Sequence, residues 1–226
     1  MSAAAAEKFE LNVDADTRVD ALLQHPPHAL ACFVFAHGAG AGMTHAFMQA
    51  FADGLAARRI ATLRYQFPYM QRGSRRPDAP ALAHATVRAA CGAAVDRTPD
   101  LALFAGGKSF GGRMTSQAQA VAPLAAVKGL IFVGFPLHPP EKPSLDRAAH
   151  LADVGVPMLF LQGTRDELAE PTLIADTVKR LGANALLYSV DGADHSFHVL
   201  KRSGRSDAEV LATLLDTTAE WIRSQR

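Results

Sequence analysis

The stretch LALFAGGKSFG, residues 101–111, decides the fold of this chain. An apolar run leads directly into two glycines, a lysine, Ser109 and a further glycine, and a helical pattern follows over 110–121. Residues 107–111 fit the pattern G-x-S-x-G. When a strand turns sharply into a helix, side chains on either side of the central serine would clash, so glycine is needed there. We therefore expect Ser109 at the end of a strand and the start of a helix.

The same alternation of strand and helix patterns recurs along the chain. Strands are expected over 8–13, 17–24, 29–36, 60–65, 101–105, 127–132, 158–162 and 185–190. Helices are expected over 44–58, 78–97, 110–121, 144–153, 167–182 and 207–224. This alternation predicts an α/β fold: a mostly parallel sheet of about eight strands, with helices on both faces and the first two strands as an antiparallel edge. The loops that follow the parallel strands should converge at one edge of the sheet.

Length and charge exclude several classes of protein. The 226 residues fit one domain over 1–226, and the formal net charge of +1 lacks the basic excess of a protein that binds nucleic acid or an anionic membrane. Two cysteines are too few for a disulfide framework or a four-cysteine zinc site, and we expect no metal. We find neither a signal peptide nor an apolar run long enough to cross a bilayer, so we expect a cytoplasmic protein.

Two further loops carry the partners that a reactive serine needs. A serine is a weak nucleophile unless a base accepts its proton, and the base needs an acid to orient it. Asp166 follows the strand at 158–162, and His195 follows the strand at 185–190. The chain order Ser, Asp, His is that of α/β-hydrolases. We therefore predict a catalytic triad of Ser109, Asp166 and His195.

The loop HGAGAG, residues 37–42, follows the third strand. Its small residues would let backbone N–H groups approach a substrate oxygen, so we assign the oxyanion hole to the N–H groups of Ala39 and Phe110. His37 is expected in a structural role beside this loop and is also a candidate substrate contact. The dinucleotide-binding fingerprint G-x-G-x-x-G fails here because its last glycine would fall at Met43 or at His45, and we expect no cofactor.

With these motifs the chain resembles small α/β-hydrolases of the dienelactone-hydrolase-like kind. It is most similar to a lidless group with an HGAGAG loop. Further segments that carry the resemblance are Arg64–Met70, Arg75–Pro77, Gly106–Ser109, Gly111–Met114 and Phe135–Pro140. The resemblance covers nearly the whole chain and implies the fold and the triad roles. Dienelactone hydrolases proper use a cysteine where Ser109 stands, so the resemblance does not imply dienelactones as substrates.

The surroundings of Ser109 suggest an open site. About 22 residues, 134–155, connect the sixth and seventh strands, which is enough for a loop and a short helix but not for a lid domain. Leu137 and Phe197 are expected to form an apolar wall together with Phe110. Arg113, one helical turn after Ser109, is expected to anchor the loop that follows the sixth strand.

Four arginines lie near the loop after the strand at 60–65. Arg64, Arg72, Arg75 and Arg76 are expected to cluster there. Arg75 or Arg76 could bind a carboxylate or phosphate of a substrate. The alternative is a solvated loop, or one paired to an acid such as Asp78.

The leading expectation is a serine hydrolase that cleaves a small ester or thioester. Two alternatives stay open: an interaction scaffold that keeps a vestigial site, and a peptidase. The helices and the last strand are compatible with a homodimer across a two-fold axis, but no residue pattern demands one.

Overall fold

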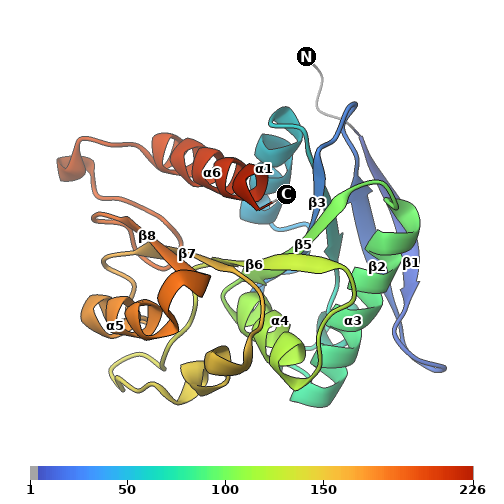
Figure 1. The fold of residues 1–226 in the computed structure, drawn as a ribbon, viewed down its shortest axis with the longest axis horizontal. Helices are drawn as coiled ribbons and strands as arrows, with labels where there is room; N and C mark the ends of the chain where they lie inside the picture. Colours follow the sequence, from blue (N-terminus) through green and yellow to red (C-terminus); the bar gives the residue numbers. More distant parts are fainter. Residues whose placement is uncertain (1–4, 226) are drawn as a thin grey trace.

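An eight-stranded sheet runs through the molecule in the order β1-β2-β4-β3-β5-β6-β7-β8 (Figure 1). The computed structural model describes residues 5–225. β2 runs antiparallel to both of its neighbours, and the neighbouring pairs from β4 to β8 are parallel. The strands are β1 (Ala6–Asn12), β2 (Arg18–Gln24), β3 (Ala31–Ala36), β4 (Ile60–Tyr65), β5 (Ala102–Lys108), β6 (Val127–Val133), β7 (Met158–Gly163) and β8 (Ala185–Val190). The carboxyl ends of the parallel strands therefore share one edge of the sheet.

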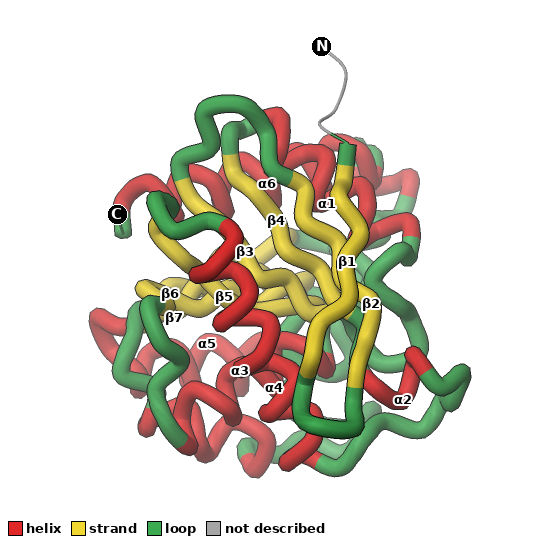
Figure 2. Tube along the Cα trace, turned by 90° about the vertical axis from the view of Figure 1, so that its right-hand side faces the viewer, coloured by secondary structure: helices red, strands yellow, loops and turns green. Residues whose placement is uncertain are grey.

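Helices cover both faces of the sheet, which lies between two helical layers (Figures 1 and 2). One layer consists of α1 (Ala46–Ala57) and α6 (Asp207–Ser224). The other layer consists of α3 (Pro80–Arg97), α4 (Phe110–Val121) and α5 (Pro171–Leu181). The short elements are α2 (Pro68–Gln71) and the 3-10 segments η1 (Asp146–Asp153), η2 (Gly182–Asn184) and η3 (Lys201–Ser203). Within residues 5–225, no helix combines the length and the hydropathy that spanning a membrane requires.

β3 shows why the central strands are continuous apolar runs. All six of its residues are buried, because each face of the strand meets a helical layer. Cys32, Val34 and Ala36 pack toward α3 and α4, whereas Phe33 and Phe35 pack toward α1 and α6. The two-residue period of a strand thus divides one apolar run between two cores.

Arg64 is a fully buried charge in β4. Its guanidinium donates to the backbone oxygen of Met43 at 3.1 Å and to Oε1 of Gln49 on α1 at 3.0 Å. Burial lowers the pKa of Arg64. The expected arginine cluster is therefore incomplete, because Arg64 stabilises the contact between β4 and α1 in the interior and is separate from Arg75 and Arg76.

The predicted fold class is confirmed, and the expected elements are present with shifted ends. The strand expected at 101–105 continues to Lys108. The helix expected over 167–182 begins only at Pro171, because the Glu170 carboxylate caps it by accepting from the N–H groups of Thr172 and Leu173. The short helix α2 escaped prediction, since four residues are too few for a periodic signal.

The connection between β6 and β7 has no lid domain, as expected. Residues 134–157 are all described and contain a single regular element, the 3-10 segment η1. The carboxyl edge of the sheet is therefore left open between the loops that follow β3, β5, β7 and β8.

Backbones approach closely where β5 turns into α4. A Cβ atom on Gly111 would lie 2.6 Å from the carbonyl oxygen of His37, and one on Gly107 would lie 2.5 Å from the carbonyl oxygen of Ala36. Real Cβ atoms do not come this close to backbone oxygens, so larger residues would push α4 away from β3. The two glycines let the helix start directly over the end of β3.

This contact predicts opposite outcomes for two glycine-to-alanine substitutions. Gly111→Ala should lower the free energy of unfolding by about 1–3 kcal/mol through overpacking. Gly92→Ala is the matched control, because Gly92 is exposed inside α3 and a Cβ there would have no atom within 4 Å. It should raise the free energy of unfolding by about 0.5–1 kcal/mol. Urea denaturation measures both, and a Gly111→Ala protein as stable as the wild type would contradict the close approach.

Candidate functional site

Ser109 occupies the turn between β5 and α4 in a strained conformation. Its φ of 49° and ψ of −116° lie in a region that residues with a side chain rarely adopt. Its N–H donates to the carbonyl oxygen of Val133 at 3.1 Å, and its carbonyl oxygen accepts from the N–H of Arg113 at 3.1 Å. These bonds to β6 and α4 hold the strained turn in place.

A continuous chain of hydrogen bonds links the three residues of the predicted triad. The Ser109 Oγ lies 2.9 Å from Nε2 of His195, and Nδ1 of His195 lies 2.7 Å from Oδ2 of Asp166. A carboxylate only accepts, so Nδ1 carries the proton and Nε2 is free to accept from the serine hydroxyl. The structure thus brings together three residues from the loops after β5, β7 and β8, in an order that suits proton transfer from Ser109.

The Asp166 carboxylate is fully buried and held from two sides. Its Oδ2 accepts from Nε2 of Gln162 at 2.6 Å, and its Oδ1 accepts from the N–H of Leu168 at 2.8 Å. Oε1 of Gln162 in turn accepts from the N–H of Phe135 at 2.9 Å. Gln162 therefore orients the acid that faces His195. Sequence reasoning missed this residue, although a polar side chain at the end of an apolar strand was an available signal.

Lys108 fixes the position of the histidine loop. Its Nζ donates to the backbone oxygen of His195 at 2.7 Å. Burial lowers the pKa of Lys108 to about 8, and the charges of Asp166 and Asp194 oppose that shift. A side chain from the end of β5 thereby joins the serine turn to the loop that follows β8.

The N–H groups of Ala39 and Phe110 are available to a ligand. Among the hydrogen bonds of residues 5–225, neither of these groups donates to another protein atom. Phe110 is the first residue of α4, and amides in a first helical turn have no partner within their own helix. Ala39 lies beside Ser109 on a cavity wall. The oxyanion-hole role of these two groups stays a prediction.

Two cavities meet at Ser109 and share Ala39 and Leu168. The first, of about 380 Å³, is named the histidine-side cavity; its further lining is Gly38, Ala41, His45, Phe47, Met48, Lys108, His195 and Ser196. The second, of about 430 Å³, is named the arginine-side cavity; its further lining is Pro77, Asp78, Pro80, Phe110, Arg113, Met114, Gln117, Pro136 and Arg147. Ser109 therefore has room for a substrate group on either side.

The structure places several expected substrate contacts away from these cavities. His37 and Leu137 are fully buried and line neither cavity. Phe197 is also buried, and its ring stacks on Phe47 with centroids 6.2 Å apart. The apolar wall comes from Phe47 and Leu168 among others, so we do not retain His37, Leu137 and Phe197 as substrate contacts.

The arginines also differ from expectation. Arg75 and Arg76 are exposed and line neither cavity. Asp78 pairs with Arg72, whose Nη2 lies 2.6 Å from Oδ1, which agrees with the alternative of a solvated loop paired to this acid. Within residues 5–225 the side chain of Arg113 makes no hydrogen bond, so the structure does not show it anchoring the loop after β6. Arg75 and Arg76 have no contact that supports an anion-binding role.

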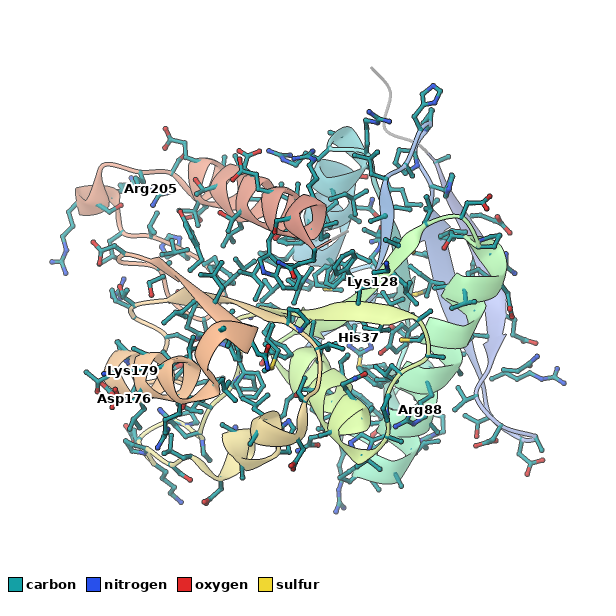
Figure 3. All side chains as sticks on the ribbon, viewed as in Figure 1. His37, Arg88, Lys128, Asp176, Lys179 and Arg205 are labelled. Atoms are coloured by element: carbon teal, nitrogen blue, oxygen red, sulfur yellow. The ribbon has the colours of Figure 1, made fainter. Side chains whose placement is uncertain are left out.

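His37 has a structural role beside the glycine-rich loop (Figure 3). Its Nε2 accepts from the N–H of Phe67 at 3.0 Å, and its Nδ1 donates to the carbonyl oxygen of Gly38 at 2.8 Å. Burial lowers the pKa of His37 to about 4. The neutral ring thus connects the loop after β3 to the loop after β4.

Within residues 5–225, no three His, Cys, Asp or Glu side chains form a group that could hold a metal ion.

Comparisons with known proteins agree with this architecture. A model of the alpha/beta hydrolase domain family matches residues 29–223. An alpha-beta serine hydrolase homologue from Coxiella burnetii has a TM-score of 0.76 at 18% identity, covering 96% of this chain and 99% of that one. A dienelactone hydrolase from Anabaena variabilis has a TM-score of 0.76 at 20% identity, covering 97% and 98%. An α/β serine hydrolase without a lid from Xanthomonas campestris has a TM-score of 0.74 at 19% identity, covering 96% and 95%.

The buried neutral His37 predicts a loss of stability in acid. Its pKa is about 4 in the folded chain and near 6.5 when the ring is exposed, so only the unfolded chain takes up a proton between these values. Stability present above pH 6.5 is therefore lost as the pH falls toward 4, at about 1.4 kcal/mol per pH unit. Between pH 7 and pH 5, the wild type should lose about 2 kcal/mol more unfolding free energy than His37→Gln.

Urea denaturation at both pH values measures this difference. His198→Gln is the control, because His198 is exposed and its pKa is raised by hydrogen bonding to Asp207. Protonation of His198 favours the folded chain, so its removal should not reduce the acid sensitivity. Equal pH dependence in wild type and His37→Gln would show that His37 is not held neutral by burial.

Proposed function

Because the chain belongs to the alpha/beta hydrolase domain family, we propose that it is a serine hydrolase that cleaves a carboxylic ester or thioester. The observation that carries the proposal is the hydrogen-bonded chain from Asp166 through His195 to Ser109, which ends where two cavities meet. The structural relatives share the fold at low identity, so the choice of reaction rests on this geometry.

In the first half-reaction, Ser109 Oγ attacks the carbonyl carbon while Nε2 of His195 takes the hydroxyl proton. The oxygen of the tetrahedral intermediate accepts from the N–H groups of Ala39 and Phe110. Each such donor typically lowers the barrier by about 3–4 kcal/mol. Asp166 stabilises the imidazolium and keeps its Nδ1 proton directed away from the serine.

The first half-reaction ends when the intermediate collapses: the bond from the carbonyl carbon to the leaving group breaks, and Nε2 of His195 gives its proton to the departing alcohol or thiol. An acyl group remains bound to Ser109 Oγ. In the second half-reaction, water attacks the acyl carbon while Nε2 of His195 takes a proton from it. The bond between the acyl carbon and Ser109 Oγ then breaks, His195 returns the proton to Oγ, and the carboxylic acid is released. Every group that these steps use is present on the chain.

Ester hydrolysis tests the proposal. We expect the wild type to hydrolyse 4-nitrophenyl esters within an acyl series from two to twelve carbons. Ser109→Ala should lower kcat by about 10⁴-fold or more, because the remaining groups supply no nucleophile. The matched control is Ser224→Ala, a serine in the last turn of α6 that lines neither cavity, and it should leave the rate unchanged. Absorbance of released 4-nitrophenolate reports the rate.

Labelling by a fluorophosphonate probe gives an independent readout of Ser109. The wild type should be labelled and Ser109→Ala should not. Folded wild type that neither turns over any ester nor reacts with the probe would favour the interaction scaffold. Cleavage of aminoacyl amides at rates close to those of esters would favour a peptidase.

A further inference from the structure

Two arginines, Arg113 and Arg147, line the arginine-side cavity. Nε of Arg113 is buried and has no hydrogen bond. Within residues 5–225, neither Arg113 nor Arg147 forms a salt bridge, although both line this cavity together with Ser109. The remaining N–H donors of these side chains are therefore free to meet an anion that enters the cavity.

The fold holds these two arginines on facing elements. Arg113 lies on α4, three residues before Ser116. Arg147 lies on η1, three residues before His150. The Ser116 Oγ lies 2.7 Å from Nε2 of His150, which joins the two elements. Residues three apart share a face in both kinds of helix. The bond that joins α4 to η1 thus keeps both arginines beside the same cavity.

The acid that lines this cavity is already bound to other groups. Asp78 lines the cavity, but its Oδ1 is bound to Arg72 at 2.6 Å and its Oδ2 accepts from the N–H of Tyr69 at 2.8 Å. His150 adds no positive charge at neutral pH, since burial lowers its pKa to about 4. The positive charge of Arg113 and Arg147 is therefore left for a ligand.

The position of His195 decides which part of a substrate enters this cavity. His195 must deliver a proton to the leaving group, so the leaving group has to lie on the side of the histidine. His195 lines the histidine-side cavity and is absent from the lining of the arginine-side cavity. The acyl chain of a bound ester therefore extends into the cavity that contains the arginines.

We propose that Arg113 and Arg147 bind the free carboxylate of an acyl group, so that the preferred substrates are half-esters or half-thioesters of dicarboxylic acids. This inference rests on the serine hydrolase activity proposed above. Guanidinium groups match a carboxylate through paired N–H donors, and both arginines line the cavity that contains Ser109.

Two substrates that differ only in this charge test the proposal. One is 4-nitrophenyl hydrogen adipate, and the other is its methyl-capped analogue, 4-nitrophenyl methyl adipate. The corresponding pair of suberates tests a longer acyl chain. The measured quantity is the ratio of kcat/KM for the charged ester to kcat/KM for the capped ester. In the wild type this ratio should exceed one. Arg147→Gln and Arg113→Gln should each lower it by about 10- to 100-fold, as expected for a lost charge-assisted hydrogen bond.

Control variants separate this subsite from general surface charge. Arg202→Gln removes an exposed arginine of η3 that lines neither cavity, and it should leave the ratio unchanged. Arg147→Glu should lower the ratio further than Arg147→Gln, because it repels the carboxylate. A larger fall in Arg75→Gln or Arg76→Gln than in Arg147→Gln would overturn the proposal.

The outcome also distinguishes this inference from the proposed function. Turnover of the capped ester with a ratio near or below one in the wild type would overturn the carboxylate subsite and leave the hydrolase intact. Calorimetric binding of 4-nitrophenyl hydrogen adipate to Ser109→Ala needs no turnover. Binding that is at least 10-fold weaker in Ser109→Ala combined with Arg147→Gln supports the subsite even if esters are not cleaved, and equal binding overturns it.

Discussion

The close contact between α4 and the end of β3 is the constraint on which the rest of the structure depends. Gly107 and Gly111 allow the helix to start against backbone carbonyls, and Ser109 takes its strained conformation between them. The turn presents the hydroxyl at the carboxyl edge of the sheet, next to the unpaired amides of α4. β7 and β8 end at the same edge of the sheet. The close packing at the end of β5 therefore determines where Ser109 lies relative to Asp166 and His195.

Around this point, buried polar groups hold the loops together. Gln162 orients Asp166 and also binds the chain after β6, while Lys108 binds the backbone of His195. His37 connects the glycine-rich loop to the loop after β4. Three of these bonds join segments that are distant in sequence: Gln162 to the chain after β6, Lys108 to the His195 loop, and His37 to the loop after β4. The site is therefore organised before any ligand arrives, which is what electrostatic stabilisation of a transition state requires.

The sequence predicts those features that follow from periodicity and topology. Apolar runs reveal the strands, and parallel strands bring the loops of Ser109, Asp166 and His195 to one edge, where the structure places them within hydrogen-bond distance. The direction of a loop side chain has no such signal. His37 points into the core, and Arg75 lies in solvent. The position of Arg147 depends on how η1 packs on α4, which no local pattern encodes.

The bond between Ser116 and His150 gives the site a modular character. The hydrogen-bonded chain of Ser109 draws on the loops after β5, β7 and β8, whereas Arg147 comes from the connection between β6 and β7. Under the proposed function, exchange of residues in that connection changes which acyl chain binds and leaves Ser109, Asp166 and His195 in place. Substitutions in one short 3-10 segment, η1, would therefore alter substrate selectivity separately from the reacting groups.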